Sequence, residues 1–182
     1  MKRPKTLESE HSFIDICLLI DRSGSMGSIF KETVEGTNNF IKEQTDMAIS
    51  SGIKTNITIK TFDNEPTTIV DNMDITQLSE LDKTLLSPRG CTKLIDTAFE
   101  TLLEQNRRKK SLMSEESSNP KMIFAIITDG MDNMSKLYSP TNLNTLLTKL
   151  GDEGLVSLFL GANQDAIQQG CQLGFKKDHS LT

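Results

Sequence analysis

Three oxygen-bearing side chains follow a short apolar run at intervals of two residues. Asp21, Ser23 and Ser25 come directly after the segment 13–20, whose composition predicts a buried parallel strand. In an open α/β sheet the carboxyl edge of the strands is where ligands bind. A carboxylate and two hydroxyls at that edge form an all-oxygen donor set, which suits a hard cation such as Mg²⁺. The sequence therefore predicts a metal site here.

Two further oxygen donors occur at comparable positions. Thr92 lies in a glycine-containing loop before a helical pattern, and Asp129 follows 122–127, the most apolar strand of the chain. Parallel neighbouring strands would bring Asp21 and Asp129 to the same crevice. The alternative is that these residues only cap helices and close turns, which Ser, Thr and Asp commonly do.

Strand and helix patterns alternate along most of the chain. This order favours an α/β fold with a mostly parallel sheet and helices on both faces. One pair of strands, 53–62 and 67–73, is expected to form a hairpin. A basic run at 107–110 is expected to close a helix, and a polar connection follows it. The other elements are expected at 28–50, 94–110, 143–150, 155–160 and 164–173.

Composition fits one soluble domain. The chain has 182 residues, of which 36% are hydrophobic and 25% charged, with a net charge of −5. Lysine and arginine are scattered, so nothing indicates nucleic-acid binding. Three widely spaced cysteines and two histidines give no zinc pattern and indicate reduced thiols. No segment resembles a signal peptide or a membrane span, so a cytoplasmic location is expected, with residues 1–12 as a flexible segment.

Three motifs in order carry a family resemblance. They are D-R-S-G-S-M at 21–26, G-C-T at 90–92 and I-T-D-G at 127–130. Together they resemble the metal-ion-dependent adhesion site, or MIDAS, of the von Willebrand factor A (VWA) domain family. The resemblance covers about residues 13–175, and the segment 159–166 is similar to small stand-alone bacterial or phage members.

The resemblance implies a ligand set and a fold. Ser23 and Ser25 would bind Mg²⁺ or Mn²⁺ directly, Asp21 and Asp129 directly or through water, and Thr92 directly in a high-affinity state. The fold would be doubly wound, over residues 13–182, with an antiparallel edge strand. Family members usually add a last strand and helix. Here 176–182 leaves room only for the beginning of that strand, so we expect the C-terminal end of the domain to be truncated.

The function implied is a non-enzymatic, metal-dependent protein-binding module that captures an Asp or Glu carboxylate of a partner, without nucleic acid or membrane. Loop residues would set its specificity: Met26, Arg89, Asn133 and Met134. Asp63, Asp132 and Asn133 could tune the site, although solvated turns are the favoured interpretation of these three.

Two alternatives come from other functional classes. One is a scaffold subunit of an ATPase-containing complex, although the chain has no Walker motif. The other is a metal-assisted hydrolase or phosphatase with Asp21 or Ser23 as nucleophile. Against the hydrolase, Ser23 occupies the position where a second acid would be expected. Ser23 also lacks a G-x-S-x-G context, and His11 and His179 lie near the termini.

Overall fold

The computed structural model describes residues 13–115, 120–129, 132–161, 164–175 and 180–181. Within them, six strands form one sheet in the order β3-β2-β1-β4-β5-β6. All neighbouring pairs are parallel except β2 and β3, which form the antiparallel hairpin at one edge. The predicted α/β fold is thereby confirmed. The strands are β1 (Phe13–Asp21), β2 (Lys54–Phe62), β3 (Pro66–Asp74), β4 (Lys121–Thr128), β5 (Val156–Gly161) and β6 (Ser180–Leu181).

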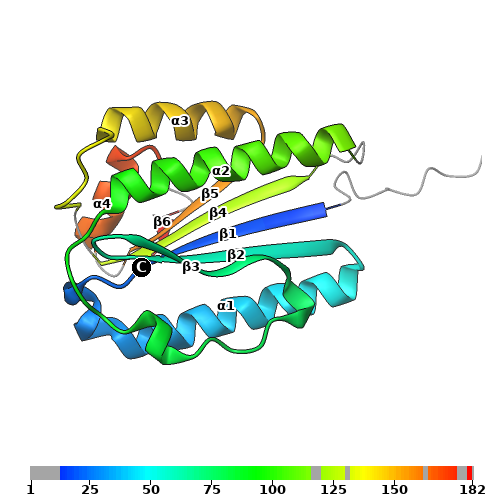
Figure 1. The fold of residues 1–182 in the computed structure, drawn as a ribbon, viewed down its shortest axis with the longest axis horizontal. Coiled ribbons are helices and arrows are strands. Elements are labelled where there is room, and N and C mark those ends of the chain that lie inside the picture. The colour runs from blue at the N-terminus through cyan, green and yellow to red at the C-terminus, as the bar shows by residue number, and fades with distance from the viewer. Residues whose placement is uncertain (1–12, 116–119, 130–131, 162–163, 176–179, 182) are drawn as a thin grey trace, which may run out of the picture.

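Helices cover both faces of the sheet. Figure 1 shows α1 (Phe30–Ser51) on one side and α2 (Leu94–Glu115) and α3 (Pro140–Asp152) on the other. A fourth helix, α4 (Gln164–Gln172), follows β5. The described residues also form three short 3₁₀ helices: η1 (Gly24–Ile29), η2 (Ile75–Gln77) and η3 (Lys83–Leu86).

The apolar strand β1 faces a core on each side. Because side chains alternate along a strand, Cys17 and Leu19 join the cluster under α2 and α3. Leu18 and Ile20 join the cluster under α1. Burial on both faces explains why β1 is apolar almost throughout rather than alternating with polar residues.

Helix α2 is longer than the sequence pattern indicated. The basic run at 107–110 does not end it, because the helix continues to Glu115. The predicted helix end was wrong for a local reason. Leu112, Met113 and Glu115 are good helix formers, and residues 111–119 contain neither glycine nor proline.

The end of the chain follows the expectation for the last strand. Ser180 and Leu181 pair in parallel with β5 as a two-residue strand, and no helix follows α4 within the described residues.

A groove of about 520 Å³ runs beside α1, lined in part by Phe40, Ile127 and Leu160. Residues 1–12, expected to be flexible, lie outside the described residues.

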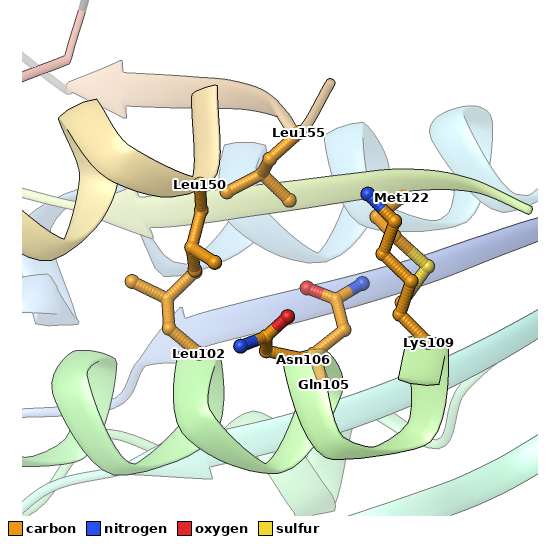
Figure 2. Close-up of a pocket in the computed structure, with 7 residues that line it drawn as sticks. All are labelled: Leu102, Gln105, Asn106, Lys109, Met122, Leu150 and Leu155. Atoms are coloured by element: carbon orange, nitrogen blue, oxygen red, sulfur yellow. The ribbon is translucent and has the colours of Figure 1, made fainter. Parts of the chain in front are cut away.

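A small cavity lies between α2, α3 and the start of β4 (Figure 2). Its volume of about 10 Å³ has room for roughly one water molecule. The Gln105 side chain beside it donates hydrogen bonds to the Asp15 and Ile123 carbonyls, at 3.2 and 3.1 Å. The cavity is therefore a packing feature near the amino ends of the strands, remote from the carboxyl edge.

The three cysteines are free thiols. Burial raises the pKa of the Cys17 thiol to about 12, so this thiol is inert at neutral pH. Cys91 and Cys171 are exposed. None of the described helices has the length and apolarity needed to cross a bilayer.

Candidate metal centre

Four of the five predicted ligands lie together at the carboxyl edge of β1 and β4. The Ser23 and Ser25 hydroxyl oxygens are 3.1 Å apart, and Ser25 Oγ donates to Asp129 Oδ1 at 2.9 Å. Asp21 Oδ1 accepts from the Ser23 backbone N–H at 2.7 Å. These side chains are close together because the parallel register pairs Ile20 with Ile127, so that β1 and β4 end next to each other. We call Asp21, Ser23, Ser25, Thr92 and Asp129 the candidate centre.

Asp21 is held in one orientation. It is 1% exposed, and its second oxygen accepts from Thr128 Oγ1 at 2.6 Å. Burial raises the pKa of the Asp21 carboxyl above its usual range. The bonds from Thr128 and Ser23 oppose this shift, and the charge of Asp129 adds to it. In the metal-free chain a charged Asp21 is therefore unfavourable, and a nearby cation would relieve that cost.

The fifth residue, Thr92, is positioned by its backbone. Its N–H donates to Asn133 Oδ1 at 2.9 Å, and its carbonyl accepts from Asn133 N–H at 3.0 Å. The same loop contacts the segment after β1, where the Gly24 N–H donates to the Gly90 carbonyl at 3.1 Å. These contacts bring the Thr92 loop beside the candidate centre.

Gly90 is required by the shape of this loop. Its φ is +69°, a left-handed conformation, and a Cβ at this position would lie 2.7 Å from Asn64 Oδ1. That Asn64 oxygen is already engaged, because it accepts from the Cys91 N–H at 2.6 Å. A side chain at position 90 would therefore displace the loop that carries Thr92.

Two arginines share one buried carboxylate, that of Asp63, next to the centre. Asp63 accepts from Arg22 Nε at 2.9 Å and from Arg89 Nε at 2.6 Å. Although burial raises the pKa of Asp63, the bonds from Arg89 and the Glu65 N–H and the charge of Arg22 hold it below its usual range. The interpretation of Asp63 as a solvated turn residue was wrong, because the residue is only 4% exposed.

The donor set fits a small, hard divalent cation. Six-coordinate Mg²⁺ has metal–oxygen distances of about 2.0–2.1 Å, which places adjacent ligand oxygens about 2.9 Å apart. The two spacings from Ser25 Oγ, 3.1 and 2.9 Å, match such edges. The described residues hold no group of three or more His, Cys, Asp and Glu, so a zinc-type cluster is not formed there. Metal binding by the five residues stays a prediction that this geometry supports.

The predicted specificity residues differ in their access to a partner. Met26 is 1% exposed, so it packs inside the protein and the prediction for it was wrong. Asn133 is committed to Thr92, and Met134 is half-buried. The side chain of Arg89 is 66% exposed. Asp132 accepts from Ile95 N–H and from Ser135 Oγ, so it organises the start of α2 and its own loop.

No sequence pattern indicated the role of Asp96. This residue is 1% exposed, and its carboxylate accepts three backbone N–H bonds at 3.0 Å, from Lys136, Leu137 and Tyr138. It thereby fixes the loop that presents Asn133 to Thr92. Gly130 of the third motif and both histidines lie outside the described residues.

We expect Asp96→Asn to destabilise the protein by about 1–3 kcal/mol, because an amide cannot satisfy all three N–H donors. Burial raises the pKa of Asp96, but the three N–H bonds and the charge of Lys93 hold it below its usual range. The stability that ionised Asp96 contributes is therefore complete above about pH 4. It is lost as the pH falls through the lowered pKa of Asp96 in the folded state.

Hydrogen exchange at Lys136–Tyr138 and urea unfolding at pH 7 would check this prediction. Asp82→Asn is the matched control, since Asp82 caps an exposed turn through one backbone N–H, that of Thr84. Equal losses in the two variants would contradict the role given to Asp96.

A doubly wound α/β domain with oxygen donors at its carboxyl edge is the class of protein that the fold and the site define. The profile of the von Willebrand factor type A domain matches residues 15–181, so the chain belongs to this family. No curated protein sequence matches the chain.

Solved structures show the same fold at low sequence identity. One is proximal thread matrix protein 1 of the mussel byssus with a zinc-occupied MIDAS motif. It has a TM-score of 0.59 and 18% identity, and the match covers 95% of this chain and 42% of that one. The vWF domain of the type V pili tip protein Mfa5 from Porphyromonas gingivalis has a TM-score of 0.61 and 11% identity, with 94% and 90% covered. Manganese-loaded TRAP protein from Plasmodium vivax has a TM-score of 0.57 and 18% identity, with 84% and 58% covered.

This chain spans only 42% of the length of the mussel protein. Because the sequence identities are low, the likeness to these solved structures establishes a shared fold.

Proposed function

We propose that the chain is a Mg²⁺- or Mn²⁺-dependent protein-binding module that captures a partner's Asp or Glu carboxylate at the candidate centre. The observation that carries the proposal is the line of oxygens from Ser23 through Ser25 to Asp129 at the carboxyl edge of the sheet. Family membership, the zinc-occupied MIDAS motif of the mussel protein and the manganese-loaded TRAP protein support it.

The chemistry follows from the donor types. Ser23, Ser25 and Thr92 would hold the cation through neutral hydroxyls, and Asp21 and Asp129 would offset its charge. A divalent cation held in this way supplies an electrophilic position that accepts one further oxygen ligand. Ser25 is exposed while Ser23 and Asp21 are buried, which leaves the Ser25 side of the centre open to a partner.

We propose a non-catalytic role. Both oxygens of Asp21 accept hydrogen bonds, from Ser23 N–H and Thr128 Oγ1. A carboxylate held in this way is better suited to act as a fixed metal ligand than as a nucleophile. A cytoplasmic location belongs to the same proposal, supported by three free thiols.

Calorimetric titration of Mn²⁺ into the chain and into Ser23→Ala tests the proposal. We expect saturable binding that weakens by roughly 10–100-fold in the variant. Ser28→Ala is the matched control, because Ser28 is an exposed serine of η1, the 3₁₀ helix that follows Ser23, and is not a predicted ligand. Equal affinities for wild type and Ser23→Ala would overturn the assignment of the site.

A second measurement tests carboxylate capture itself. A glutamate-containing peptide should bind in Mg²⁺ buffer and be released by EDTA. Peptide binding that survives both EDTA and Ser23→Ala would overturn the proposed mode of capture.

A further inference from the structure

Arg89 carries a positive charge beside the centre that is only partly matched. Asp63 is a single carboxylate shared between two guanidinium groups, those of Arg22 and Arg89. Within the described part of the chain, neither arginine forms another ion pair. The three side chains together therefore keep one net positive charge.

This charge resides on Arg89 for structural reasons. The Arg22 side chain is 10% exposed, and its terminal nitrogens donate to the Leu85 carbonyl and to Thr67 Oγ1. The Arg89 side chain is 66% exposed. Among the described residues, its only side-chain hydrogen bond runs from Nε to Asp63 Oδ2, at 2.6 Å.

The exposed end of Arg89 is suited to a carboxylate. A guanidinium presents its terminal nitrogens as a planar fork that binds a carboxylate through two parallel hydrogen bonds. Asp63 already restrains this side chain through Nε. A partner would therefore lose less side-chain freedom on binding it than on binding an unrestrained surface arginine.

The backbone of Arg89 lies close to the candidate centre. The Arg89 N–H donates to the Arg22 carbonyl at 2.7 Å, so its backbone runs along the segment that carries Ser23. The three residue steps from Arg89 to Thr92 reach at most about 11 Å.

A polar groove extends from Arg89 along the turn between β2 and β3. It has a volume of about 380 Å³, and its lining includes Asn64, Glu65, Thr67 and Gly90. Such a lining suits an extended peptide. The exposed Glu65 carboxylate disfavours a continuous acidic run and so restricts the match to isolated acids.

We propose that Arg89 is a second anchor that selects partners with two acidic side chains. One carboxylate would bind at the candidate centre, and the other would bind the Arg89 fork. An extended chain rises about 3.3 Å per residue, so a separation of at most about 11 Å places the two acids two or three positions apart. This inference rests on the proposed function.

Two glycine–serine peptides test it in Mg²⁺ buffer, one with a single glutamate and one with two glutamates three positions apart. We expect the wild type to prefer the second peptide by about tenfold, the size of one charge-assisted contact. Arg89→Gln should lose this preference, and Arg89→Lys should keep only part of it. Arg107→Gln removes the same charge at an exposed arginine of α2 and should keep the full preference.

The outcomes separate the two proposals. If the single-glutamate peptide binds in a Mg²⁺-dependent manner and the ratio is the same in wild type and Arg89→Gln, the second anchor is wrong and the proposed function stands. If neither peptide shows Mg²⁺-dependent binding, the proposed function fails, and the inference fails with it. Thermal unfolding of each variant verifies that the protein remains folded.

Discussion

Replacing Asp21 by asparagine is expected to weaken Mn²⁺ binding by roughly 10–100-fold while leaving the metal-free chain at least as stable as wild type. Asparagine keeps an oxygen for the Ser23 N–H, and the Thr128 hydroxyl can turn to accept from the new amide. What disappears is the charge, which burial and Asp129 make unfavourable without a cation.

The pH dependence gives this prediction a sign. The pKa of Asp21 in the metal-free fold lies above its usual range, so ionising this carboxyl costs stability as the pH rises through its folded-state pKa. The stability gain of Asp21→Asn in EDTA should therefore be present at pH 8 and vanish below pH 4.

Thermal unfolding with EDTA and with Mn²⁺ measures both effects. Mn²⁺ should raise the melting temperature of wild type and of Asp46→Asn, which removes an exposed charge on α1, and should raise that of Asp21→Asn by less. An equal Mn²⁺-induced rise in all three proteins would refute the role of Asp21.

Arg108→Ala is expected to cost about 3–5 kcal/mol of stability, because it strips the partner from a buried carboxylate. Asp15 is 0% exposed and accepts from Arg108 Nε at 3.0 Å. Its other oxygen has no hydrogen-bond partner among the described residues. In the variant, this acid would be left inside the sheet layer without its cation.

Protonation of Asp15 limits that loss. Burial raises the pKa of Asp15 above 3.8 even though Arg108 lowers it, and removing Arg108 raises it further. Because the pKa of Asp15 is higher in the folded than in the unfolded state, the protein is most stable at low pH. Its stability declines as the pH rises through the folded-state pKa. The deficit of Arg108→Ala should thus be smaller at pH 5 than at pH 8.

Urea unfolding at the two pH values checks this, with two companions. Asp15→Asn combined with Arg108→Ala should recover part of the loss. Arg107→Ala, at the exposed neighbour, should stay within about 0.5 kcal/mol of wild type. A pH-independent deficit would show that packing, and not the charge of Asp15, accounts for it.

The fold was predictable because its signals are local. Apolar runs such as 122–127, bounded by polar turns, predicted the strands, and Gly52 in a left-handed conformation ends α1 where the Ser51-Gly52 pair indicated. The end of α2 was missed because helix propensity beyond the basic run outweighs the charge pattern.

The candidate centre was predictable only in part. Asp21, Ser23 and Ser25 share one segment, and the strand order brings Asp129 to them. The supporting contacts could not be read from the chain, because they join distant residues. Asp63 meets Arg22 across 41 positions, and Asp96 meets Tyr138 across 42. No local pattern distinguishes such an aspartate from one in a solvated turn.

The long reach of the contacts at the centre has a consequence for folding. Ser25 meets Asp129 across 104 positions, and Thr128 meets Asp21 across 107. Such contacts form only after β1 and β4 have paired, late in the assembly of the sheet. An unfolded or half-assembled chain would not hold the centre. Only fully folded copies of the domain would therefore capture a partner at the centre, and a cation would stabilise only those copies.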